Sequence, residues 1–234
     1  IYAFSTYLTV LMQNYIGWSA FDTGVHQLAM SVWSLVLGPV VGILGNRFSK
    51  KWMIVVVMIL GGIGFILLIN NLSVDMGFKQ LWLTLVFVGI ANGIVNPVLN
   101  SAGMEGVAPH EMGMASGLLN VFRQFGTSFG VVILGMVEAN RYNSYFEDHL
   151  SAVKMPAQAA AGLHKAIINA GPFSGHQIAF SERLSKVPFA HDFQQVVIRA
   201  FDHGMVGVSL TAAVIVLIGA AGAIFFMRDA KTTI

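Results

Sequence analysis

Hydrophobic residues fall into six long stretches, at residues 1–14, 23–44, 52–69, 81–102, 113–137 and 203–227. Each of the last five is long enough, at a rise of about 1.5 Å per residue, to cross the ~30 Å hydrocarbon core of a bilayer as an α-helix. The first stretch would span only about 21 Å. We therefore predict six membrane helices, the first of them truncated, and expect the chain to be the C-terminal part of a longer protein.

The composition excludes most soluble classes of protein. Of the 234 residues, 56% are hydrophobic and 10% are charged, and the mean hydropathy is +0.71. Soluble domains carry about 25% charged residues, so an ordinary cytosolic domain, a disordered chain and a nucleic-acid-binding protein are all excluded. The 13 Lys and Arg against 11 Asp and Glu are too few and too scattered to form a basic face. A multi-pass membrane protein remains.

The residues able to do chemistry form no reactive group in the sequence. Cysteine is absent, which excludes disulfides and thiolate chemistry. The sequence also lacks a metal-ligand pair, a nucleophile motif and a phosphate-binding loop. We therefore predict that the protein is not an enzyme and has no catalytic residue, no metal and no cofactor.

Charges in the short connections indicate the orientation of the helices. The connection after the second stretch holds Arg47, Lys50 and Lys51, and the C-terminal tail adds Arg228 and Lys231. Both lie on one side if the helices alternate in direction. By the positive-inside rule, that side is cytoplasmic.

The long segment 139–202 then lies on the opposite side of the membrane and is predicted to be an extracytoplasmic loop. Its alanine-rich part, 157–170, is expected to form a short surface helix. The predicted organisation is 1–138 for the first five helices, 139–202 for this loop, and 203–234 for the last helix and a cytoplasmic tail.

Polar side chains are distributed unevenly among the predicted helices. The stretches 52–69 and 203–227 are almost purely apolar, whereas the other four carry polar groups. Polar side chains inside a bilayer are costly, so we expect these four helices to surround a polar cavity. The predicted cavity residues are Gln13, Asn92, Asn96, Asn120, Arg123, Gln124 and Thr127.

Two of these sets have helical spacing. The asparagines of 81–102 recur every fourth residue, and the polar residues of 113–137 fall at positions i, i+3, i+4 and i+7, so each set forms one stripe. Intramembrane amides also hydrogen-bond neighbouring helices without any other function. That interpretation stays open for Asn96, Asn100 and Gln124.

Arg123 is the one charge placed near the midplane, about 15 Å from the inner end of its helix. A charge at that depth costs roughly 3 kcal/mol or more. Glu111 and Glu138, on the same helix, are about 18 and 22 Å away and too distant to pair with it. Either helix carbonyls and Asn92 satisfy Arg123, or its partner lies outside this chain.

Four motifs appear in order along the chain. Residues 13–24 are similar to Q-x-x-x-G-[YF]-S-x-x-x-x-G, and residues 39–51 resemble P-x-x-G-x-L-x-D-R-x-G-x-[RK] with Asn46 and Ser49 at two motif positions. A glycine-rich helix with Gly89 and Gly93 follows. Residues 115–131 resemble A-S-G-x-x-N-x-x-R-Q-x-G-x-x-x-G-V. The combination resembles the C-terminal half of a major facilitator superfamily transporter, of the fourteen-helix EmrB/QacA type of drug:proton antiporter.

The resemblance implies an all-α, six-helix membrane bundle whose first, second, fourth and fifth helices surround the cavity, which are the four that carry polar groups. It implies proton-coupled efflux of amphipathic or cationic compounds across the bacterial cytoplasmic membrane. Transport would occur by alternating access between this half and an N-terminal half, so we expect this chain alone to transport nothing. A periplasmic adaptor is a possible further partner. The implied cytoplasmic gate loop consists of Gly42, Asn46, Arg47, Lys50 and Lys51.

Two other functions remain open at this point. The same half could serve an uptake transporter for sugars or siderophores, although the Arg123–Gln124 helix favours drug efflux. The chain could also be a membrane scaffold fragment that transports nothing and uses the segment 139–202 as a docking surface.

Overall fold

The structure is a computed structural model that describes residues 1–44, 48–72, 76–182 and 184–227, and within these ranges all regular structure is helical. The helices are α1 (Tyr2–Val10), α2 (Ala20–Leu44), α3 (Lys50–Asn71), α4 (Phe78–Gly103), α5 (Met112–Leu150), α6 (Ala157–Ala179) and α7 (Ala190–Phe226). A π-helical turn, η1 (Leu11–Tyr15), continues α1, and a 3-10 turn, η2 (Pro109–Glu111), leads into α5. In this all-α membrane fold, α2, α3, α4, α5 and α7 are long and apolar enough to cross a membrane.

All six predicted helices are present, and the helix expected at 157–170 is α6. Two of the six are much longer than their apolar stretches: α5 runs on to Leu150, and α7 begins at Ala190. With 39 and 37 residues, they measure about 58 and 56 Å, well beyond the ~30 Å hydrocarbon core. The segment 139–202 is therefore mostly helical rather than an open loop, and its side of the membrane remains a prediction.

The helix of α5 continues past its apolar stretch because its sequence becomes amphipathic. Tyr142, Phe146 and Leu150 recur every fourth residue and are buried, whereas Glu147 and Asp148 between them are exposed. This is the period of an α-helix with one packed face. The packed face lies against α6 and α7.

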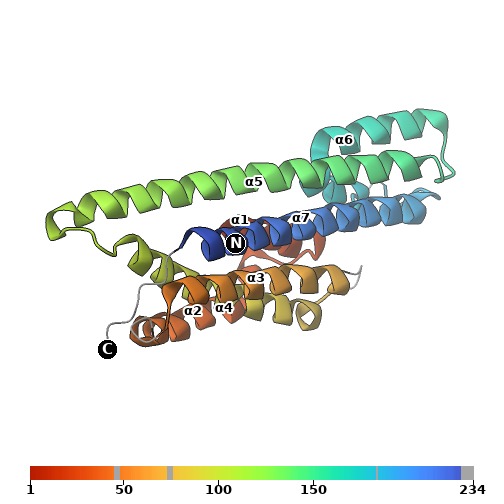
Figure 1. The fold of residues 1–234 in the computed structure, drawn as a ribbon. Helices are drawn as coiled ribbons and strands as arrows, with labels where there is room; N and C mark the ends of the chain where they lie inside the picture. Colours follow the sequence, from red (N-terminus) through yellow and green to blue (C-terminus); the bar gives the residue numbers. More distant parts are fainter. Residues whose placement is uncertain (45–47, 73–75, 183, 228–234) are drawn as a thin grey trace.

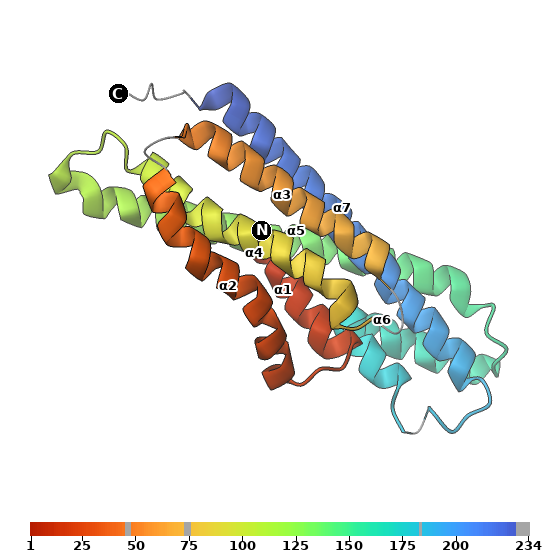
Figure 2. The ribbon, with the colours of Figure 1, turned by 90° about the horizontal axis from the view of Figure 1, so that it is seen from below.

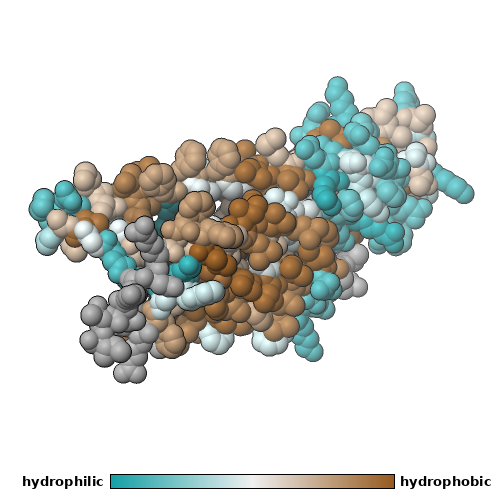
Figure 3. Space-filling view, viewed as in Figure 1, coloured by the Kyte–Doolittle hydropathy of each residue, from teal (hydrophilic) through white to brown (hydrophobic). Residues whose placement is uncertain are grey.

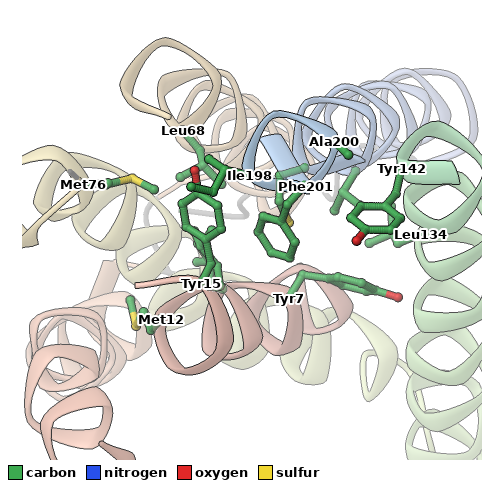
Figure 4. Close-up of a cluster of buried hydrophobic side chains, with 14 of the residues drawn as sticks. Tyr7, Met12, Tyr15, Leu68, Met76, Leu134, Tyr142, Ile198, Ala200 and Phe201 are labelled. Carbon is green, nitrogen blue, oxygen red and sulfur yellow. The ribbon is translucent and has the colours of Figure 1, made fainter. Parts of the chain in front are cut away.

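The helices form two connected groups (Figures 1 and 2). α5 lies along α7, with α6 beside the end of both, and α3 joins this group to the other by packing on α7 and on α4. α2 packs on α4 at the edge of the molecule. The largest hydrophobic core lies where α1, η1, α5 and α7 meet, and its labelled members include Tyr7, Tyr15, Leu134, Tyr142 and Phe201 (Figure 4).

Glycines permit the close approach of α2 to α4. A Cβ atom on Gly89 would lie 2.5 Å from the carbonyl oxygen of Met30, and one on Gly93 would lie 2.8 Å from the Cα of Ser34. Both neighbours are backbone atoms of a helix and cannot turn aside. Small residues at four-residue spacing therefore set the distance between these two helices.

Candidate functional site

The polar stripes of α4 and α5 meet at Arg123. Its Nη2 donates a hydrogen bond of 2.8 Å to Oδ1 of Asn100, and its Nη1 lies 3.5 Å from Oδ1 of Asn120. The next turn of α5 is tied to the same residue, because the hydroxyl of Thr127 donates to the Arg123 carbonyl at 2.9 Å. Within the chain the partner is Asn100 and not Asn92 as predicted. A further partner outside the chain stays a prediction.

Arg123 lies between two cavities. The first, of about 580 Å³, is lined by α1, by Gln27 of α2, and by Arg123, Gln124 and Thr127 of α5. The second, of about 530 Å³, reaches α3, α4 and α7 and includes Asn96 together with Arg123 and Thr127. Arg123 and Thr127 line both cavities, so the polar stripe of α5 forms part of the wall that the two share.

The two cavities differ in chemistry. Hydroxyl and amide side chains of α1 and α2, from Ser5, Thr6, Thr9 and Gln27, line the first. The second is mainly apolar, with side chains such as Phe4. A cavity with hydroxyl and amide groups on its wall lies beside a more apolar one, and the Arg123 guanidinium lines both. This arrangement suits a molecule that has a polar end and an apolar body.

The hydroxyl residues of the first cavity are the part of the site that the predictions missed. Gln27 Nε2 donates to Thr9 Oγ1 at 2.7 Å, which joins α1 to α2 across this cavity. Ser5 and Thr9 are one helical turn apart, and this spacing is the signal that could have identified them.

Four of the seven predicted cavity residues line these cavities: Asn96, Arg123, Gln124 and Thr127. The other three line neither cavity. Gln13 is exposed on η1, and Asn120 is exposed on α5. Asn92 is 9% exposed inside α4, where its carbonyl accepts a 3.1 Å hydrogen bond from Asn96 Nδ2.

The predicted gate loop is described in part. Gly42 is exposed near the end of α2, and Lys51 is half-buried at the start of α3. Lys50 Nζ forms an ion pair with Glu105 Oε2 at 3.1 Å and also donates to the carbonyl of Ser101 at 3.3 Å. These bonds join the start of α3 to the end of α4 and the residues that follow it. Asn46 and Arg47 lie outside the described residues.

The surface is divided along the length of the molecule (Figure 3). Hydrophobic side chains cover its middle, and hydrophilic side chains gather at the end formed by α6 and the adjoining ends of α5 and α7. Large apolar side chains of α2 and of the first half of α5 are exposed, among them Leu35 at 77% and Phe122 at 65%. Such a surface requires lipid or another protein around it.

Comparison with known proteins identifies a family. Residues 1–131 match the sequence model of the Major Facilitator Superfamily, which is more than half of the chain. The match covers α1 to α4 and the part of α5 that carries Arg123.

Curated relatives are bacterial resistance and export proteins. The tetracenomycin C resistance and export protein of Streptomyces glaucescens is 30% identical over 96% of this chain and 41% of its own length. The multidrug transporter protein MdtP of Bacillus subtilis is 27% identical over 79% of this chain and 35% of its own. The cephamycin export protein CmcT of Amycolatopsis lactamdurans is 32% identical over 55% of this chain and 26% of its own. The chain thus spans about two fifths or less of the length of these relatives.

Proposed function

The chain belongs to the major facilitator superfamily, and on this premise we propose that it is the C-terminal half of a proton-coupled multidrug efflux transporter of the fourteen-helix EmrB/QacA type. Its relatives are resistance and export proteins, which supports export over the uptake of sugars or siderophores. The proposed location is the bacterial cytoplasmic membrane, with the C-terminus in the cytoplasm and 139–202 outside.

The observation that carries the proposal is the position of Arg123. Its guanidinium is held by Asn100 at 2.8 Å and lines both a hydroxyl-rich and an apolar cavity. An amphipathic substrate would place its polar end near α1 and its apolar body toward α4 and α7. Sites of this kind lie near the midplane of a transporter, between halves that rock against each other.

The exposed surface supports the proposal that the chain is one half of the transporter. The first half of α5 carries Arg123, and its large apolar side chains Phe122 and Phe125 are each 65% exposed. In a complete transporter, this face and that of α2 would be turned toward the N-terminal half. The chain covers 41% of the length of the tetracenomycin C resistance and export protein, which supports the proposal that it is one half of such a protein.

The test is export by the complete transporter with Arg123→Ala. We expect drug resistance to fall by about tenfold or more, because the loss of a charge-assisted hydrogen bond costs about 1.5–3 kcal/mol. Arg123→Lys should retain part of the activity, since the charge stays but the forked geometry is lost. Lys79→Ala, which removes an exposed charge outside both cavities, is the matched control.

Minimal inhibitory concentrations and the amount of protein in the membrane are measured together. Full resistance with Arg123→Ala at normal protein level would contradict the proposed site. Drug-dependent proton flux in liposomes that contain only these 234 residues would contradict the proposal that the chain is one half of the transport unit.

A further inference from the structure

A carboxylic acid lies in the core of the bundle and lines neither cavity. Glu138 is 0% exposed and occupies the buried stripe of α5, between Leu134 and Tyr142. Neither of its carboxyl oxygens has a hydrogen-bond partner within the described part of the chain. Buried polar groups nearly always have a partner, so this residue requires an explanation.

The backbone of α7 closes over the Glu138 side chain. A Cβ atom on Gly204 would lie 3.1 Å from Glu138 Cγ and 3.2 Å from the Glu138 carbonyl oxygen. The glycine therefore allows α7 to pack directly on this acid. This close packing keeps water out on the α7 side.

Two tyrosines belong to the same buried core, Tyr7 of α1 and Tyr142 of α5 (Figure 4). The Tyr7 hydroxyl donates to the carbonyl oxygen of Val131 at 2.9 Å. The Tyr142 hydroxyl is buried against Gly175 of α6. Phenolic groups can hydrogen-bond a carboxylic acid in either protonation state, but they carry no positive charge.

Three titratable residues next to Glu138 or Gly204 along α5 and α7 have other contacts. The aliphatic part of Arg141 lies against Gly207, and Arg141 is exposed. Asp202 accepts a 2.8 Å hydrogen bond from Tyr15. The ring of His203 packs on Tyr145 at 5.3 Å between centroids. Among the described residues, none forms an ion pair with Glu138.

An ionised carboxylate in such a place would be both dehydrated and unpaired. The free-energy cost of that state is so large that a buried group takes up a proton instead. We propose that Glu138 is a proton-binding site of this chain, which holds its proton while α5 is packed on α7 and releases it when the two helices separate.

The role of this site in coupling rests on the proposed function. Alternating access requires helices of the bundle to move relative to one another. Separation of α5 from Gly204 would admit water to Glu138 and allow it to ionise. Glu138 would then bind a proton in one arrangement of the helices and release it to water in the other. The proton is the only species that is transferred.

The protonation state is tested by infrared spectroscopy of the full chain in lipid nanodiscs near neutral pH. The spectrum of Glu138→Gln is subtracted from that of the original chain. We expect the difference to show loss of the carbonyl stretch of a protonated carboxylic acid. In the matched control Glu111→Gln, at an exposed acid, we expect loss of carboxylate bands only. Loss of carboxylate bands in Glu138→Gln would overturn the proposal.

A second measurement needs no variant. Infrared spectra of the unsubstituted chain are recorded near neutral pH in H2O and in D2O. We expect the carbonyl stretch of a protonated carboxylic acid, and we expect it to shift only slowly in D2O, because the packing of Gly204 on Glu138 keeps water away. Absence of this stretch would overturn the proposal even if Glu138→Gln does not fold.

Coupling is tested separately in the complete transporter. Glu138→Gln should abolish drug-dependent proton flux. If Glu138→Gln leaves the proton flux unchanged and the infrared spectra show a protonated Glu138, then Glu138 binds a proton but has no role in coupling, and that part of the proposal is overturned. Absence of drug export by the unsubstituted transporter would instead overturn the proposed function and leave the infrared result intact.

Discussion

The two halves of α5 lie in opposite surroundings, although both are continuous helix. In the second half, Glu138, Tyr142 and Phe146 are each 0% exposed and pack against α6 and α7. In the first half, Phe125 is 65% and Phe129 is 58% exposed. Hydrophobicity therefore does not decide which part of a membrane helix is buried. Burial is decided by which helices pack against each part, because the lipid hydrocarbon outside a helix bundle is as apolar as the interior of the bundle.

The ionisable residues of the two halves of α5 also differ in their hydrogen-bond partners. Arg123, in the exposed half, has a hydrogen-bonded partner, whereas Glu138, in the packed half, has none among the described residues. An open cavity leaves room for a charge and its polar partner. The close contact between α5 and α7 leaves room only for a neutral group. The helix α5 thus presents a permanent charge to the proposed substrate and holds an acid that is neutral until α5 and α7 separate.

The largest expected difference between the halves is in packing energy. Phe146→Ala should destabilise the chain by about 3 kcal/mol, because Phe146 is fully buried and packs on Phe193 at 6.1 Å between ring centroids. Phe125→Ala, the same change in the first half, should alter stability by less than about 0.5 kcal/mol. Reversible unfolding in mixed micelles measures both. Equal losses would show that the two halves of α5 are packed alike.

A smaller effect is expected where α7 packs on the second half of α5. Gly204→Ala should cost about 1–2 kcal/mol, since its Cβ would meet both the side chain and the carbonyl oxygen of Glu138. Gly222→Ala, also in α7, is the matched control, because no atom lies within 4 Å of a Cβ atom at that position. We expect that change to be neutral or to stabilise the chain by up to about 1 kcal/mol. The same unfolding assay applies, and an equal loss for both variants would show that the contact of Gly204 with Glu138 is not the cause.

The smallest expected effect is a pH dependence in α6, outside the spanning helices. Burial lowers the pKa of His176, whose ring packs on Phe180 at 4.3 Å and Tyr15 at 5.9 Å. Because the pKa in the folded state is below that in the unfolded state, the unfolded state takes up the proton first as the pH falls. Stability should therefore be full above the ordinary histidine pKa and decline below it.

His176→Phe keeps an aromatic ring at this place and removes the titration. Melting temperatures between about pH 7.5 and 5 should decline less in this variant than in the original chain. His191→Phe, at a side chain that is 81% exposed, should leave the slope unchanged. Identical slopes for all three proteins would show that α6 does not shield His176 from the solvent.

The sequence was sufficient to predict the helices and the polar stripe of α5. Apolar stretches of span length have few alternatives in a bilayer, and the spacing of Asn120, Arg123, Gln124 and Thr127 directs them to one side of a helix. The predicted partner of Arg123 within the chain, Asn92, was wrong because depth was judged from Cα positions alone. A long side chain leans toward the N-terminus of its own helix, which brings this guanidinium to Asn100 instead of Asn92.

Glu138 was missed for a different reason. It stands where hydropathy falls, so it was read as the outer end of a span. The helix in fact continues, and burial depends on what α1, α6 and α7 place around it, which a local pattern does not contain. The four-residue spacing of Leu134, Glu138, Tyr142 and Phe146 could have indicated a packed face with an acid in it.

The unbroken length of α5 also has a mechanical consequence. Arg123 and Asp148 lie on one rigid rod without a proline between them, about 38 Å apart along the axis. A tilt of about 10° around the guanidinium would therefore displace Asp148 sideways by about 7 Å, which makes the helix a lever that enlarges a small rearrangement at one end. A spectroscopic label or an antibody fragment bound near Asp148 would therefore report helix movements that begin at the cavity.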